Sequence, residues 1–321
     1  MAGFRQLMRR YTFIDYASQV YLVIVGLLLL FFHNQTVPYW PYVCAGHLVA
    51  ILAIHILVTW NNTRVTLRFW NFLRHFYPVI LYVLLYEETG RLNQMFHQGY
   101  LDEIFIRLDQ AIFGLQPSLL FMERLPHLLI SEVFYLFYFS YYIMIFGTGL
   151  AIYLKCREHF FHYISLVSFV FYVCFLIYIF LPVVGPRIFF PEFSVHELRP
   201  SITEIQAPPY PESVKAGPFY QIMAVIYRYF ETPGAAFPSS HVAVAICTLF
   251  FTFKYLRPIR HFHTVAVVLL CLSTVYCRYH YAVDVIAGAL TAAILLPVGN
   301  WLFAKFPNNT QSPATKTDAN R

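Results

Sequence analysis

Long apolar blocks, rather than alternating or narrow helical stripes, dominate the pattern of hydrophobic and polar positions along the chain. An α-helix needs about 20 apolar residues to cross a lipid bilayer, so such blocks predict membrane-spanning helices, about eight in all. The third is the weakest, because its apolar run is short and begins beside Arg74, His75 and Pro78. The predicted spans run approximately over Ala17 to Phe32, Tyr42 to Thr59, Phe76 to Tyr86, Val133 to Tyr153, Tyr163 to Leu181, His241 to Leu256, Thr264 to Tyr276 and Tyr281 to Phe303.

Two stretches between the spans predict amphipathic helices at the membrane surface. From Asp102 through Asp109 and just beyond, apolar residues recur at positions 104, 105, 108 and 112, as they do on one face of a helix. An apolar and aromatic patch from Phe219 to Phe230 is the second such stretch. The predicted fold is therefore an all-α, polytopic transmembrane bundle, with a six-span catalytic core, N-terminal additions and interfacial helices.

The same pattern predicts three regions along the chain. Residues 1–130 form an N-terminal transmembrane and interfacial region, and residues 131–307 form the catalytic membrane domain. Residues 308–321 are polar and rich in Thr, Asn and Lys, which is typical of a disordered tail.

Composition strengthens the membrane interpretation and removes other classes. Hydrophobic residues make up 59% of the chain and charged residues only 12%, a balance unlike that of a soluble domain. The six cysteines form no CxxC pair, so they indicate packing rather than a zinc site or a disulfide framework. The net charge of +6 is spread over the loops, which argues against nucleic acid as a partner.

Positive residues predict the orientation, since Lys and Arg in short loops stay on the cytoplasmic side. The loop from His33 to Trp40 has neither, as expected of the opposite face. Both termini are therefore expected to be cytoplasmic, with the polar site at the periplasmic, extracellular or lumenal face. The basic clusters that fall on the cytoplasmic side are Arg5, Arg9 and Arg10; Arg64, Arg68 and Arg74; Lys155 and Arg157; and Lys254, Arg257 and Arg260.

This topology brings three polar clusters to the non-cytoplasmic face. They are Gly185-Pro186-Arg187, the segment from Phe237 to His241, and the segment from Arg278 to Asp284. His241 begins one span and His280 follows the return span, so a helical hairpin of ordinary length places the two histidines side by side.

The residue types in these clusters point to phosphoryl chemistry. Asp284 lies four residues after His280, so on a helix its carboxylate can hold one imidazole nitrogen and leave the other free to attack. His241 can then supply a proton, and Arg187 and Arg278 can neutralise phosphoryl oxygens. Ser239 and Ser240 occupy N-cap positions, where the helix start favours an anion.

These residues resemble the type 2 phosphatidic acid phosphatase superfamily of membrane lipid phosphatases and phosphotransferases. Pro238, Ser239 and His241 fit its Pro-Ser-x-His motif, and His280 with Asp284 fits its His-x-x-x-Asp motif, followed by Gly288. The resemblance covers about Val133 to Phe303. It implies a reaction without metal or cofactor, in which His280 attacks phosphorus to form a phosphohistidine, Asp284 orients it and His241 protonates the leaving oxygen.

The chain also departs from that family's pattern. Phe180 stands where the first motif has a lysine, and Ile188 rather than proline follows Arg187. Arg278 precedes His280 by two residues instead of six. These departures resemble the inositol phosphorylceramide synthase branch, which transfers the phosphoryl headgroup to an alcohol. The preceding region adds to that likeness through Asp109, Phe113, Gly114 and Pro117.

The function predicted is metal-independent dephosphorylation of a membrane lipid phosphate, with phosphoryl transfer between lipids as the alternative. A transporter is disfavoured because charges are nearly absent within the spans and no internal repeat is visible. A catalytically inactive relative that only binds lipid remains a third hypothesis. Asp109, Glu132 and Glu192 are expected to be exposed interfacial charges, and isolated histidines such as His162 to be structural.

Overall fold

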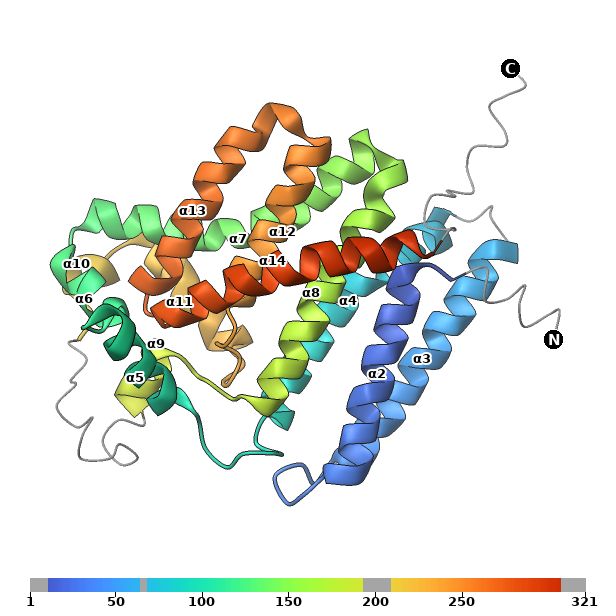
Figure 1. The fold of residues 1–321 in the computed structure, drawn as a ribbon, viewed down its shortest axis with the longest axis horizontal. Coiled ribbons are helices and arrows are strands. Elements are labelled where there is room, and N and C mark those ends of the chain that lie inside the picture. Colours follow the sequence, from blue (N-terminus) through green and yellow to red (C-terminus); the bar gives the residue numbers. More distant parts are fainter. Residues whose placement is uncertain (1–10, 64–67, 193–208, 307–321) are drawn as a thin grey trace.

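The computed structural model describes residues 11–63, 68–192 and 209–306, and this part of the chain is all-α, as the sequence predicts (Figure 1). Its described residues contain no β-strand, only an isolated bridge between Val183 and Ala235. The long helices are α2 (Phe13–Phe32), α3 (Trp40–Thr63), α4 (Arg68–Leu92), α7 (Leu128–Lys155), α8 (Phe160–Phe180), α12 (Ser240–Tyr255), α13 (Arg260–Tyr276) and α14 (Ala282–Ala304). The shorter elements are α5 (Asp102–Phe113), α6 (Pro117–Arg124), α9 (Pro186–Glu192), α10 (Glu212–Lys215), α11 (Pro218–Phe230) and the 3₁₀ turns η1 (Arg157–His159) and η2 (Arg257–Ile259).

Six of the described helices are long and apolar enough to cross a membrane, which indicates an integral membrane protein. They are α2, α3, α7, α8 together with η1, α13 together with η2, and α14. The other two predicted spans correspond to α12, which is apolar but has only 16 residues, and to α4, which includes Arg74, Glu87 and Glu88. The predicted count of eight spans is therefore not confirmed and stays a prediction.

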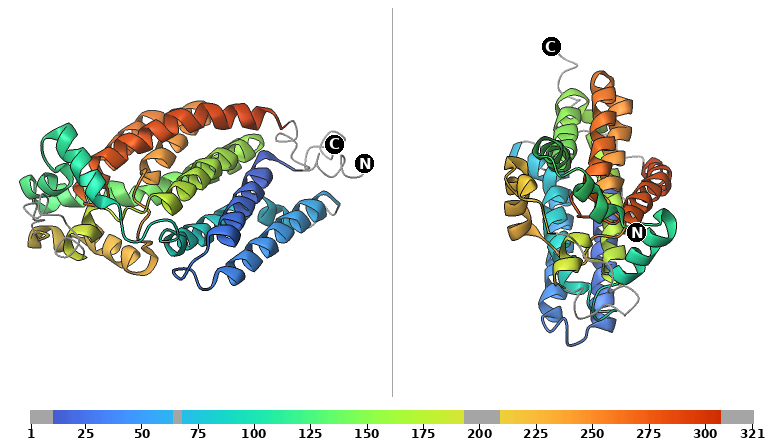
Figure 2. Two further views of the ribbon diagram at one scale, coloured as in Figure 1. Left: turned by 60° about the horizontal axis from the view of Figure 1, so that its bottom comes forward. Right: turned by 90° about the vertical axis from the view of Figure 1, so that its left-hand side faces the viewer.

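Helix α8 lies at the centre of the bundle, with α3 and α13 farther out (Figures 1 and 2). It packs against α2, α4, α7, α12 and α14. Of its apolar span, 72% is buried, against 22% for α3 at the edge. The additional N-terminal helices α2 and α4 therefore share one core with the later helices. The predicted division near residue 130 is not tested by this packing.

The two stretches predicted as amphipathic helices are both helical. Helix α5 buries Asp102 and Asp109 together with Phe105 and Ile106, and exposes Ile104 (52%), Leu108 (42%) and Ile112 (57%). Exposed apolar side chains of this size suit lipid contact better than water contact. Helix α11 likewise buries only Met223 among its residues. Their location at a membrane surface stays a prediction.

The basic clusters that the structure describes lie far along their helices from the candidate site. Lys155 ends α7 and Lys254 lies at the end of α12, and the two turns meet where the His159 ring stacks on Tyr255 at 4.1 Å. His241 lies at the other end of α12. Arg5, Arg9, Arg10 and Arg64 and the tail 308–321 lie outside the described residues. The side of the membrane on which each end lies stays a prediction.

A buried ion pair joins α2 to α4. Asp15 is fully buried, and Arg74, which is 4% exposed, donates a hydrogen bond to its Oδ2 atom. Thr12 adds its backbone N–H at 2.7 Å and its hydroxyl at 2.8 Å to the same oxygen, and the Tyr77 hydroxyl donates to Oδ1 at 2.8 Å. A buried carboxylate is tolerated when it is paired and hydrogen-bonded in this way.

Replacing Arg74 by methionine is expected to lower the free energy of unfolding by about 3–5 kcal/mol, because Asp15 then stays buried without its countercharge. Equilibrium unfolding in mixed micelles measures this change. The double variant Arg74→Met/Asp15→Asn, which removes both charges, is expected to recover much of the loss. A single variant as stable as the wild type would show that the pair does not hold α2 to α4.

Candidate active site

The two predicted histidines meet at the starts of α12 and α14. His241 lies in the first turn of α12, and His280 lies two residues before α14 begins. The Nε2 atom of His280 is 3.3 Å from the Nδ1 atom of His241. Two imidazoles from separate helices therefore face each other through one ring nitrogen each.

Asp284 lies on the far side of the His280 ring. Its Oδ2 atom is 3.4 Å from His280 Nδ1 and also accepts a hydrogen bond from the backbone N–H of Tyr281 at 2.9 Å. The first distance is longer than that of an optimal hydrogen bond, and such contacts often tighten when substrate binds. The carboxylate therefore lies at one nitrogen of His280, and the other nitrogen is directed to His241.

Burial decides the protonation state of His280, whose side chain is only 3% exposed. It lowers the pKa of His280 to about 4, and a backbone hydrogen bond with Ala236 opposes this shift only in part. A histidine with this pKa is a neutral imidazole at pH 7. The Nε2 lone pair is then available as a nucleophile.

The first turns of α12 and α14 touch through their backbones. The N–H of Ser239 donates to the carbonyl oxygen of Asp284 at 3.2 Å, and the Ser239 hydroxyl caps α12 by accepting from the N–H of Val242 at 3.4 Å. A Cβ atom at Gly288 would lie 2.5 Å from the Ser239 carbonyl oxygen. Glycine at this position therefore permits the contact that brings the histidines together. Ser239, predicted to bind phosphate, is fully buried as a cap.

Two carboxylates of α5 hold the loops that carry the site residues. Asp109 accepts the N–H groups of Ala282 and Val283 at 3.0 and 2.9 Å and so caps α14. Asp102 accepts the N–H groups of Val184 and Gly185 at 3.0 and 2.9 Å, next to Arg187. Both side chains are fully buried. Burial raises the pKa of both carboxyls, that of Asp102 to about 7, and the backbone donors oppose the shift.

The structure corrects the expectation that Asp109 and Glu132 are exposed interfacial charges. Asp109 is 0% exposed, and Glu132 is partly buried because it accepts the N–H groups of Phe219 and Tyr220 at 2.8 and 3.3 Å, at the start of α11. Backbone N–H groups at a helix start need acceptors, and neither helix has a capping Ser, Thr, Asp or Asn of its own. The side chain of Glu192 lies outside the described part.

Arg187 joins the histidines through a tight turn. Gly185 has a φ of 84°, and a Cβ there would lie 2.5 Å from the Tyr279 carbonyl oxygen. The N–H of Arg187 donates to the Arg278 carbonyl oxygen at 2.7 Å. Its guanidinium pairs with Glu231 and lies 4.9 Å from the centre of the Tyr227 ring. A cation is thus present beside His241 and His280, as predicted.

Arg278 is directed elsewhere. The backbone turns there with a φ of 62°, and the guanidinium lies 4.8 Å from the centre of the Tyr210 ring. The side chain is 3% exposed, and burial lowers the pKa of Arg278. Arg278 lines neither of the two cavities that lie beside the histidines and are described below. Its contact with phosphate stays a prediction, and this geometry does not favour it.

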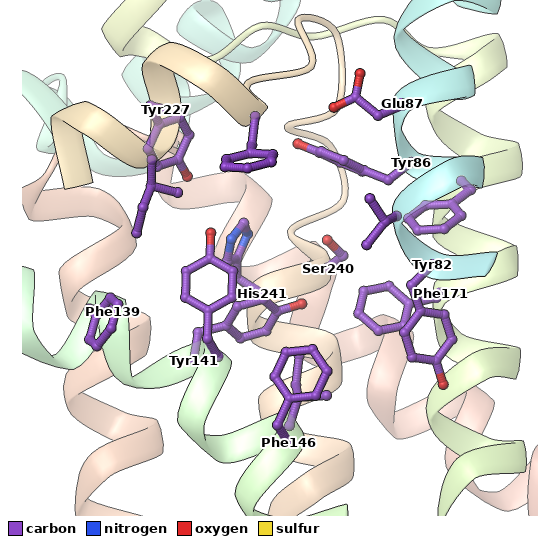
Figure 3. Close-up of a pocket in the computed structure, with 16 residues that line it drawn as sticks. Tyr82, Tyr86, Glu87, Phe139, Tyr141, Phe146, Phe171, Tyr227, Ser240 and His241 are labelled. Carbon is purple, nitrogen blue, oxygen red and sulfur yellow. The ribbon is translucent and has the colours of Figure 1, made fainter. Parts of the chain in front are cut away.

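Two cavities adjoin each other at His241. The smaller measures about 30 Å³ and is lined by polar groups that include Arg187, Glu231 and His280. The larger measures about 390 Å³ and is lined mostly by aromatic and aliphatic side chains from α4, α7, α8 and α11, together with Glu87, Ser240 and His241 (Figure 3). Tyr86, Tyr227 and His241 line both. The site therefore has a charged half and an apolar half.

Tyr138 of α7 is a site residue that the sequence did not reveal. Its hydroxyl lies 3.0 Å from His241 Nε2 and is also hydrogen-bonded to the Tyr227 hydroxyl. It is one of 25 tyrosines, and no local signal distinguishes it from those that pack in the core. Among the described residues, no group of three or more His, Cys, Asp or Glu could hold a metal ion.

Comparison with known families agrees with this geometry. The sequence model of the PAP2 superfamily matches residues 103–298, more than half of the chain and a range that includes every predicted site residue. Neither the curated proteins nor the solved structures include a significant match. The matched family supports a phosphatase-type enzyme. The chain belongs to the PAP2 superfamily.

Proposed function

We propose that the protein removes phosphate from a phosphorylated membrane lipid through a phosphohistidine intermediate on His280. Family membership supports phosphatase-type chemistry, and the observation that carries the lipid assignment is the junction of the two cavities at His241. A molecule with a phosphate head and a hydrocarbon tail matches both halves.

The large cavity supports a hydrocarbon ligand in size and in lining. Its volume of about 390 Å³ lies in the range typical of ligand pockets, and its wall is mostly aromatic. Val83, Phe146 and Phe230, which are 57%, 52% and 62% exposed, border it at the protein surface. A tail can therefore enter sideways from surrounding lipid. The α4 wall, with Tyr82 and Tyr86, lies outside the residues matched by the family.

The small cavity supports an anionic head, after a rearrangement. Arg187 is paired with Glu231, and about 30 Å³ leaves room for only one or two water molecules. A phosphate group must therefore replace Glu231 at the guanidinium and move the two imidazoles apart. Arginine binds phosphate well because its planar donors match the phosphate oxygens.

The reaction proceeds in two transfers. His280 Nε2 forms a bond to phosphorus while the bond from phosphorus to the lipid oxygen breaks, and protonated His241 gives its Nδ1 proton to that oxygen. Water then forms a bond to phosphorus, loses a proton to His241 and displaces His280. Asp284 stabilises the positive charge on His280 while the intermediate exists. An alcohol in place of water would give phosphoryl transfer.

We place this reaction at the non-cytoplasmic face. Lys254 lies at the opposite end of α12 from His241, and Lys155 ends α7 well beyond Tyr138, which lies within that helix. Because basic residues of this kind stay in the cytoplasm, the site belongs to the other side.

Purified protein in detergent is expected to release inorganic phosphate from one or more lipid phosphates in a panel presented with and without inositol and ceramide. His280→Ala is expected to lower kcat by at least about 10³-fold, because the nucleophile is lost. The exposed His127, which lines neither cavity, provides the matched control His127→Ala. Activity that survives in His280→Ala contradicts the mechanism, and formation of a new phosphodiester instead of free phosphate assigns transfer.

The protonation state of His280 gives an independent check. Because burial lowers its pKa to about 4, the ring is neutral above that pH and becomes protonated as the pH falls through it. The ring resonances of His280, assigned by their loss in His280→Asn, are expected to titrate near pH 4 rather than near 6.5, the ordinary value. A midpoint at 6 or higher would mean that the nucleophile is largely protonated in mildly acidic solution.

A further inference from the structure

Both ring nitrogens of His241 have partners, and the second one lies outside the predicted set of site residues. Nδ1 faces His280 Nε2 at 3.3 Å, and Nε2 faces the Tyr138 hydroxyl at 3.0 Å. The Tyr141 ring packs on the imidazole with ring centres 4.4 Å apart. The direction of His241 Nδ1 is therefore set by Tyr138 at the opposite nitrogen.

Tyr138 is itself held firmly. Its side chain is 0% exposed, and its ring stacks on Tyr279 with centres 4.4 Å apart. Its hydroxyl is hydrogen-bonded to that of Tyr227, whose ring stacks on Tyr279 at 4.3 Å. Tyr227 lines both cavities. The hydroxyls of Tyr138 and Tyr227, which we name the hydroxyl pair, connect His241 to the cavity wall.

We propose that Tyr138, supported by Tyr227, is the positioning residue that keeps His241 competent as both acid and base; this inference rests on the proposed function. A phenol hydroxyl can accept from Nε2–H, which His241 carries both as a protonated and as a neutral ring, and this bond keeps Nδ1 as the nitrogen that gives and takes the proton. A buried carboxylate at that place would also accept, but its charge would favour the protonated ring throughout.

The proton inventory balances with the hydroxyl pair neutral at every stage. Before the first transfer, His241 is protonated, its Nε2–H donates to Tyr138, and the Tyr138 hydrogen donates to Tyr227. When Nδ1 gives its proton to the leaving oxygen, His241 becomes neutral but keeps the hydrogen on Nε2, so both hydrogen bonds persist. When water later gives a proton to Nδ1, His241 is protonated again. No proton leaves Tyr138, and Nδ1 stays the nitrogen that exchanges the proton.

Comparison of two leaving groups tests this role, because only a poor leaving group needs the proton from His241. The probes are a short-chain alkyl phosphate lipid and p-nitrophenyl phosphate, and the measured quantity is kcat/KM, which covers the steps up to departure of the leaving group. Tyr138→Phe is expected to lower kcat/KM about 10- to 100-fold for the alkyl ester, part of the usual contribution of general acid catalysis. The aryl ester is expected to change less than about threefold. Tyr227→Phe is expected to lower kcat/KM for the alkyl ester more than for the aryl ester as well, but by a smaller factor.

Tyr135→Phe is the matched control. Tyr135 lies one turn earlier on α7, is 1% exposed and packs on Tyr279, but its hydroxyl is hydrogen-bonded to Cys277 and not to His241. It is expected to leave the ratio between the two substrates unchanged. Thermal unfolding of each variant shows whether the fold is kept.

Equal losses on both esters in Tyr138→Phe, or no loss on the alkyl ester, overturn the inference. A wild-type protein that cleaves both esters, with His280→Ala inactive, leaves the proposed function intact in either case. A wild-type protein that cleaves neither ester overturns the proposed function and this inference together.

Discussion

The contact between the first turns of α12 and α14 is the constraint on which the rest of the site depends. Ser239 and Asp284 are joined through their backbones, and Gly288 leaves the space that this approach requires. His241 and His280 are attached to these two turns, so the distance between the helix starts sets the distance between the imidazoles. Because protein interiors are close-packed, a side chain at position 288 would be felt directly at the histidines.

The second requirement is that helix starts near a membrane keep their backbone N–H groups satisfied. Helix α14 begins after Tyr281 and takes its cap from Asp109, while Asp102 holds the turn that precedes Arg187. Helix α5 supplies both carboxylates from its buried face, which also carries Phe105 and Ile106. The loops that carry His280 and Arg187 are therefore fixed by one short helix.

Much of this architecture could be predicted from sequence because its signals are local. Apolar blocks predicted the helices, and the spacing of His241, His280 and Asp284 predicted their meeting. The capping roles of Asp109 and Glu132 could not be predicted directly, since each side chain accepts N–H groups of a helix that begins far along the chain. The only signal was indirect, namely that the N-cap residues of these helices, Tyr281 and Gly217, have no side chain of the usual capping types. The sequence predicted that Arg278 binds phosphate. In the structure, the backbone of Arg278 has a positive φ and its side chain packs on Tyr210.

The site we propose unites a neutral nucleophile, His280, with a second imidazole held by a phenol hydroxyl and with one cation, Arg187, that has to exchange a carboxylate for phosphate. A structure determined with bound orthovanadate, which mimics phosphorus during transfer, tests this account most directly. The account predicts vanadium bonded to His280 Nε2, an apical oxygen within hydrogen-bond distance of His241 Nδ1, and Arg187 turned from Glu231 to the vanadate oxygens. Vanadate bonded to another residue, or bound away from both histidines, would contradict it.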